Sequence, residues 1–160
     1  MSDLQVIVRT AEAADAHAIW RVHVAAIRGV AEYYSPEHIA EWAAKHSPNS
    51  YGAIISAGRL FVAEVRGEII GFGQFDPQTG EVERAYVNPG HANRGVGRLL
   101  MQEAERRAGV AGLAHIYLFA SLNAVQFYLR CGYRRAACAI GSPARANHAE
   151  TRFMTKAVGR

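Results

Sequence analysis

The stretch VNPGHANRGVGR, residues 87–98, runs from a predicted strand through a turn into a predicted helix. Glycines at 95 and 97 let the backbone curl and approach a ligand without a clash from Cβ. The first amides of the helix have no acceptor within it and together carry about half a positive charge. With Arg94 and Arg98 beside them, these amides favour a site for a pyrophosphate.

Other phosphate-binding folds fit this stretch less well. A dinucleotide fold uses G-x-G-x-x-G in a mainly parallel chain with a later acidic residue, and the third glycine is missing here. The G-K-[ST] of a P-loop is missing too. A plain strand-to-helix turn, in which the two glycines serve only tight packing, stays open as an interpretation.

Hydrophobic periodicity on both sides predicts a single α/β domain over residues 1–160. Alternating or apolar runs predict strands at 5–9, 60–65, 69–75, 81–88, 115–120, 133–141 and 151–158, with a loop at 142–148. Capping residues and helical spacing predict helices that begin near Asp15, Ser35, Ser47, Gly95 and Leu122. Gly58 and Gly132 are expected to end two of them. Because hairpins alternate with β-α-β crossovers, we expect a mixed sheet of about seven strands flanked by helices.

The composition is that of a globular chain with a basic excess. The 18 Lys and Arg residues against 14 Asp and Glu give a net charge of +4. Since no run of basic residues or RNA-binding aromatic motif accompanies it, we expect a phosphate-bearing ligand and no nucleic-acid partner. No apolar run approaches the roughly 20 residues of a membrane span, and the start does not read as a signal peptide. Cys131 and Cys138 form no C-x-x-C, so we expect reduced thiols in a cytoplasmic protein with no membrane partner.

A second motif follows downstream, at residues 123–133, with the pattern N-A-x-x-F-Y-x-x-x-G-Y. Preceded by ERAYVNP and RGVGRLL, it resembles the GNAT superfamily of N-acetyltransferases. The two motifs cover residues 81–133, and the predicted elements on either side follow the order of that family. The segment YYSPEHIAEW, residues 33–42, further resembles a YafP-like branch of small bacterial members.

The resemblance implies acetyl-CoA as the cofactor, held where the strand ending at Val87 splays from the strand at 115–120. A β-bulge or splay between the fourth and fifth strands would open this crevice. Backbone groups there would bind the pantetheine arm, an asparagine would add a bond to it, and loop amides would hold the pyrophosphate. The residues implied are Tyr86, Val87, Arg94, Gly95, Val96, Gly97, Arg98 and Asn123. The family commonly has Gln or Arg at the position of Ala92, so we expect a modest affinity for acetyl-CoA.

Three residues are candidates for acid and base chemistry. A phenol has a pKa near 10 and can donate a proton to a departing thiolate, and the resemblance implies this role for Tyr128. Glu81 and Glu83 lie two apart on one predicted strand, so they point to the same face and are candidate bases. The alternatives are a packed core tyrosine and a solvated strand face.

The sequence says less about which residues contact the acceptor substrate. The family resemblance implies an acceptor wall at Tyr33, Tyr34 and Trp42, and core packing of the second helix is the alternative. The histidines lack metal-ligand spacing, so we expect no metal, and His23 falls on an apolar helix face as a core residue would.

The leading hypothesis is transfer of an acetyl group from acetyl-CoA to a primary amine of a small molecule or peptide, directly and without a covalent enzyme intermediate. The alternative is a non-catalytic acyl-CoA sensor of the same fold. A homodimer formed by edge pairing of the last strands is possible for either.

Overall fold

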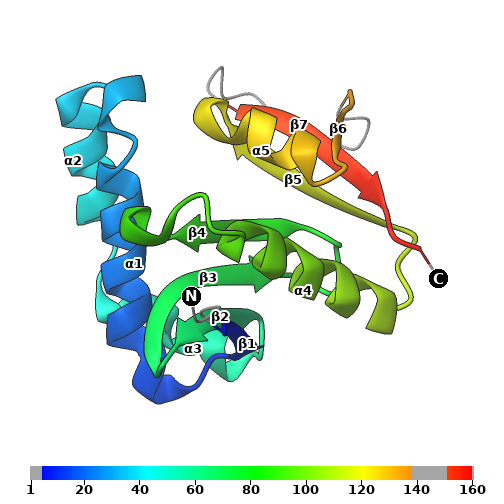
Figure 1. Cartoon of the computed structure of the whole chain (residues 1–160), viewed down its shortest axis with the longest axis horizontal. Coiled ribbons are helices and arrows are strands. Elements are labelled where there is room, and N and C mark those ends of the chain that lie inside the picture. Colours follow the sequence, from blue (N-terminus) through cyan, green and yellow to red (C-terminus); the bar gives the residue numbers. More distant parts are fainter. Residues whose placement is uncertain (1–4, 138–150, 160) are drawn as a thin grey trace. The chain divides into compact units, whose positions relative to one another are not determined.

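The computed structural model describes residues 5–137 and 151–159, and its element order is the predicted one (Figure 1). The strands are β1 (Ile7–Thr10), β2 (Leu60–Val65), β3 (Glu68–Phe75), β4 (Val82–Val87), β5 (His115–Ser121), β6 (Arg134–Arg135) and β7 (Thr151–Ala157). The helices are α1 (Ala16–Arg28), α2 (Pro36–Ala44), α3 (Gly52–Ser56), α4 (Val96–Val110) and α5 (Val125–Arg130). The predicted mixed α/β class is therefore confirmed.

Some sequence predictions lie partly or wholly outside the described residues. The strand predicted at 133–141 is described only as the short β6, and the rest of it beyond residue 137 is outside. Cys138 and the predicted loop at 142–148 are outside as well. The helix predicted from Leu122 begins instead as a 3₁₀ turn over Leu122–Ala124, and α5 follows it.

The described strands form two sheets, ordered β1-β2-β3-β4 and β5-β7-β6. The chain correspondingly divides into two compact units. The first holds the residues up to Gln74 together with Arg84–Glu103, and the second holds Phe75–Glu83 and the residues from Ala104 onward. The predicted splay between the fourth and fifth strands concerns both units and stays a prediction.

The first unit is built on an antiparallel sheet. β1 pairs with β2 from Ile7↔Glu64 to Thr10↔Phe61, and β2 pairs with β3 around a two-residue turn. Arg66 and Gly67 in that turn have φ of 51° and 78°. Two positive φ values match the twist of a tight hairpin, which explains the glycine.

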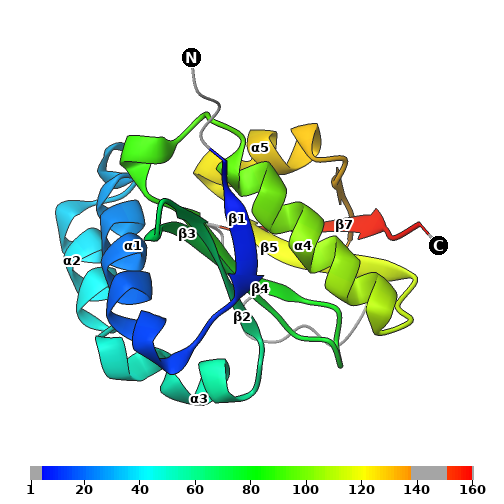
Figure 2. The same cartoon turned by 60° about the horizontal axis from the view of Figure 1, so that its bottom comes forward.

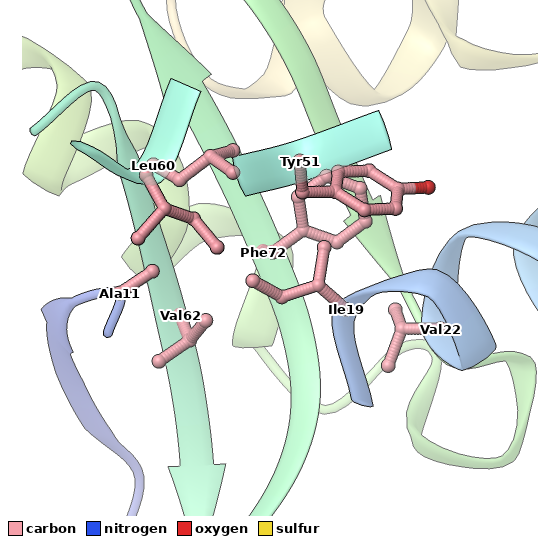
Figure 3. Close-up of a cluster of buried hydrophobic side chains, with 8 residues drawn as sticks. Ala11, Ile19, Val22, Tyr51, Leu60, Val62 and Phe72 are labelled. Atoms are coloured by element: carbon pink, nitrogen blue, oxygen red, sulfur yellow. The ribbon is translucent and has the colours of Figure 1, made fainter. Parts of the chain in front are cut away.

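The core of this unit lies on one face of the sheet, under α1 and α3 (Figures 2 and 3). Its buried members are Ala11, Ile19, Val22, Tyr51, Ile55, Leu60, Val62 and Phe72. Burial of each large apolar side chain contributes about 1.5–3 kcal/mol before entropy costs. The ring of Tyr51 lies beside Phe72, and its hydroxyl group points out of the cluster (Figure 3).

The opposite face of the sheet needs a glycine. A Cβ at Gly71 of β3 would lie 3.0 Å from the carbonyl oxygen of Tyr86 and 3.3 Å from side-chain atoms of Val96 and Leu100. The missing side chain therefore lets β4 and the first turns of α4 approach β3 closely, which fixes where the strand-to-helix turn begins.

Ser35, Gly58 and Gly132 cap their helices as the sequence predicts, whereas Asp15 before α1 makes no side-chain capping hydrogen bond. The Ser35 hydroxyl accepts a hydrogen bond from the His38 amide, and Pro36 occupies the first turn of α2. Gly58 follows α3 with φ of 72°, and Gly132 follows α5 with φ of 91°. A left-handed residue just past a helix satisfies its last carbonyl groups, and glycine takes that conformation most easily.

The second unit is organised by β7. It pairs with β5 from His115↔Ala157 to Ser121↔Thr151 and with the short β6 on its other side. Lys156 of β7 forms an ion pair of 2.5 Å with Glu105 of α4 and donates a 2.8 Å hydrogen bond to the Cys131 carbonyl. One side chain thus ties the strand to α4 and to the end of α5.

Candidate functional site

The turn from β4 into α4 has the geometry that residues 87–98 predict. A 3₁₀ turn, η4 (Pro89–His91), begins with the Asn88 side chain accepting a hydrogen bond from the Gly90 amide. Gly95 then takes a left-handed conformation with φ of 83°, and no atom lies within 4 Å of a Cβ placed on it. Gly97, by contrast, lies inside α4 and has no positive φ.

The first amides of α4 come before the hydrogen-bond ladder of the helix. The Leu99 amide donates to the Gly95 carbonyl at 3.2 Å, which is the first bond of the α-helical ladder. The amides of Val96 and Gly97 come before that bond, so they have no acceptor in the helix. Because helix dipoles leave partial positive charge at this end, the site favours an anion.

The end of α1 lies close to this turn. A Cβ on Gly29 would lie 2.8 Å from Cγ of Pro89, so the close approach requires glycine. Arg94 and Arg98, predicted beside the pyrophosphate, are both exposed, as is Ala92. All of these residues belong to the first unit.

β4 contributes a second, largely buried group of polar and aromatic side chains. His23 of α1 is 1% exposed, and its Nδ1 lies 2.7 Å from the Tyr51 hydroxyl. Its ring lies 4.6 Å from that of Tyr86 and 4.2 Å from that of His46, centroid to centroid. The Arg84 guanidinium lies 5.8 Å from the centroid of the Tyr51 ring. The prediction that His23 is a core residue is confirmed.

Burial shifts the titration of this group. Loss of water lowers the pKa of His23 to about 3, with His46 and Arg84 adding repulsion. Burial likewise lowers the pKa of His46, helped by the charges of Arg84 and Lys45, and burial raises the pKa of Tyr51 to about 12. His23 and Tyr51 are therefore neutral at physiological pH, whereas Arg84 is charged.

The predicted acceptor aromatics are only partly brought together. Tyr34 and Trp42 lie with ring centroids 5.9 Å apart, and His38 stacks on Tyr34 at 5.3 Å. Tyr33 is 57% exposed. Neither Tyr34 nor Trp42 belongs to the core cluster, and both are half-buried.

A cavity of about 560 Å³ between α1 and α2 was not predicted from the sequence. Its lining is mainly apolar and comprises Trp20, Val24, Arg28, Ala31, Pro36, Ile39, Ala40, Ala43, Ala44 and His46. The predicted aromatics are not in this lining. The i, i+4 spacing of Trp20, Val24 and Arg28 was the signal available, but it does not tell a cavity wall from a packed seam.

The second unit carries the remaining predicted residues. Asn123 is exposed in the 3₁₀ turn before α5, and Tyr128 of α5 is 8% exposed. The Tyr128 ring contacts those of Phe127 and Tyr133, at 5.0 Å and 5.8 Å between centroids. Glu81 precedes β4 and forms a parallel bridge with Tyr117, whereas Glu83 lies within β4. Both glutamates are half-buried.

Comparison with known families matches residues 30–157 to the model described as an acetyltransferase (GNAT) domain. The chain belongs to the GNAT family. A GCN5-related N-acetyltransferase of Rhodopseudomonas palustris is 26% identical, with a TM-score of 0.78 over 98% of both chains. No curated protein sequence matches the chain.

Two further solved structures share the fold of this GNAT protein. PaiA N-acetyltransferase of Thermoplasma acidophilum, solved with coenzyme A, has a TM-score of 0.81 at 19% identity, over 96% of this chain and 99% of that one. YncA of Salmonella typhimurium, solved with acetyl-CoA, has a TM-score of 0.70 at 20% identity, over 97% and 95%. Within residues 5–137 and 151–159, no helix of this GNAT protein has both the length and the apolar character of a membrane span.

We expect Gly95→Ala to lower the free energy of unfolding by about 1–2 kcal/mol, because alanine resists the left-handed conformation that starts α4. The matched control is Gly109→Ala, inside α4, where a Cβ meets nothing within 4 Å. That substitution should raise the free energy of unfolding by about 0.4–1 kcal/mol. Urea unfolding measures both, and equal stability of the Gly95 variant and the parent would contradict the assigned backbone.

We expect His23 to lower the stability of the folded protein in acid. The unfolded chain protonates this histidine near pH 6.5, but the folded chain does so only near pH 3. Unfolding therefore takes up a proton between these values, and stability falls by up to about 1.4 kcal/mol per pH unit as the pH drops. Above pH 6.5 His23 is neutral in both the folded and the unfolded chain, so it causes no loss of stability there. Urea unfolding from pH 7.5 to 4.5 tests it, with His23→Gln losing this part of the slope. A His23 ring signal that titrates near 6.5 by NMR would refute it.

Proposed function

We propose that this protein transfers an acetyl group from acetyl-CoA directly to a primary amine of a small molecule or peptide, with residues 1–160 acting as one catalytic domain. The observation that carries the proposal is the start of α4, where the left-handed Gly95 precedes the amides of Val96 and Gly97, which have no helical acceptor. Membership of the GNAT family supports it.

The residues at this turn fit the diphosphate of coenzyme A. Amides of residues 94–98 would donate hydrogen bonds to the pyrophosphate oxygens, with Arg94 and Arg98 adding charge-assisted bonds. Backbone groups of Tyr86 and Val87 would bind the pantetheine arm as an added strand does, and Asn123 would bond to it. That PaiA and YncA were solved with coenzyme A and acetyl-CoA supports this choice of co-substrate.

Direct transfer needs no covalent enzyme intermediate. The amine nitrogen attacks the thioester carbonyl carbon, a C–N bond forms, and the C–S bond breaks. Glu81 or Glu83, alone or through water, would take the proton that the amine loses, and the Tyr128 hydroxyl would protonate the departing thiolate. Holding both reactants in line can itself contribute on the order of 7 kcal/mol or more. Tyr33, Tyr34 and Trp42 would contact the acceptor.

We expect Tyr128→Phe to lower turnover at least about tenfold while leaving acetyl-CoA affinity nearly unchanged, because only the proton donor is lost. The matched control is Tyr133→Phe. Tyr133 is a neighbouring buried tyrosine whose hydroxyl has no hydrogen-bond partner among the described residues. Its loss should leave both turnover and stability intact. Release of the coenzyme A thiol with a panel of primary amines measures turnover, and unchanged turnover in Tyr128→Phe would reject the role.

The same assay across pH addresses the base and the alternative function. A double variant, Glu81→Gln with Glu83→Gln, should lose the basic limb of the pH–rate profile near neutrality, and a retained limb would reject both glutamates. Tight coenzyme A binding with no thiol release for any amine would identify the protein as a non-catalytic acyl-CoA sensor instead.

A further inference from the structure

Arg84 of β4 is a half-buried cation whose charge lacks a described counter-ion. Its Nη1 atom is buried and makes no hydrogen bond with any described residue. Such a donor has lost its hydrogen bonds to water and has no protein acceptor in their place. Because this costs free energy, native structures rarely contain one without a functional reason. An acceptor that arrives from outside the chain supplies that reason.

Among residues 5–137 and 151–159, no carboxylate forms an ion pair with Arg84. Its guanidinium lies near the ring of Tyr51, which is fully buried. Its charge also reaches His23 and His46, since it lowers the pKa of both. No carboxylate is among the charged groups that shift the pKa values of His23, His46 and Tyr51. Arg84 is therefore a cation among neutral aromatic and imidazole rings, and the charge of Lys45 also reaches His46.

The charge balance selects the kind of anion. Because His23 is neutral at physiological pH and Tyr51 keeps its proton, Arg84 supplies a single positive charge. A carboxylate carries one negative charge and matches the planar fork of a guanidinium with two parallel hydrogen bonds. A phosphate dianion would bring a second negative charge into a poorly hydrated place.

The position of Arg84 connects this cation to acetyl transfer. Residues alternate along a strand, so Arg84 and Tyr86 lie on the same face of β4, about 7 Å apart. The Tyr86 ring contacts His23, which confirms that this face of the strand meets α1. The backbone of Tyr86 is the segment assigned above to the pantetheine arm, which ends in the thioester.

We propose that Arg84 binds a carboxylate of the acceptor, so that the acceptors of this protein are primary amines that carry a carboxylate, such as amino acids and their small derivatives. This inference rests on the proposed acetyl transfer. Arg84 then orients the acceptor and sets specificity, and it takes no part in the proton transfers.

The test compares each amino acid of a panel of twenty with its own carboxamide, which keeps the amine and the side chain but loses the charge. We expect thiol release with at least one amino acid, and kcat/KM at least about tenfold lower for its amide, as for the loss of a charge-assisted hydrogen bond. Arg84→Gln should remove this acid-to-amide preference and leave the KM for acetyl-CoA unchanged. The matched control, Arg21→Gln, loses an exposed arginine of α1 and should retain the preference.

A second arm distinguishes the anion. Thermal shift in the presence of coenzyme A compares β-alanine, O-phosphoethanolamine and ethanolamine, which share an aminoethyl group and differ in the charged end. We expect β-alanine to stabilise the parent protein most and to lose that effect in Arg84→Gln. Stronger stabilisation by O-phosphoethanolamine would overturn the carboxylate assignment.

The outcomes separate this inference from the proposed function. Thiol release with amides as good as with acids, or an acid preference that survives in Arg84→Gln, would refute the carboxylate site while acetyl transfer stands. If no amine releases thiol, acetyl transfer fails, and the thermal-shift arm alone decides whether Arg84 binds a carboxylate. An equal fall in acid and amide turnover, with a lower melting temperature, would make Arg84 a structural residue and refute the proposal.

Discussion

The left-handed backbone at Gly95 is the constraint on which the proposed site depends. It turns the chain from β4 into α4 so sharply that the first amides of the helix stand at the end of the turn without helical acceptors. Gly71 supports this arrangement from the other side, because its missing side chain lets β3 lie against β4 and the first turns of α4. Two glycines on neighbouring elements thus fix where the proposed anion-binding end of the helix lies.

Strand β4 also has a second role. The side chains of Arg84 and Tyr86 face α1 and meet His23 and Tyr51, while the backbone near Tyr86 is proposed for the co-substrate. The core cluster beneath them, with Phe72 and Tyr51 fully buried, makes this face rigid. Close packing would limit the conformations of the Arg84 side chain, so that its guanidinium group suits one kind of ligand.

The sequence was enough for the order of the elements, for their caps and for the family. Gly95, Gly58 and Gly132 could be predicted because left-handed positions favour glycine strongly, and His23 because its helix face is apolar. The burial of Arg84 could not be predicted. The run ERAYV alternates, but it does not say which face meets α1, and Tyr51 and His23 come from distant segments. The cavity between α1 and α2 depends on how two helices pack, which periodicity alone leaves open.

The most direct test of the central claim is isothermal titration of the folded protein with coenzyme A and with pantetheine, which lacks the pyrophosphate and the nucleotide. If the amides at the start of α4 bind the diphosphate, coenzyme A should release heat and raise the melting temperature. Pantetheine should bind at least about 100-fold more weakly, a difference of about 2.7 kcal/mol. No heat and no thermal shift with coenzyme A, or equal affinity for the two ligands, would contradict the account.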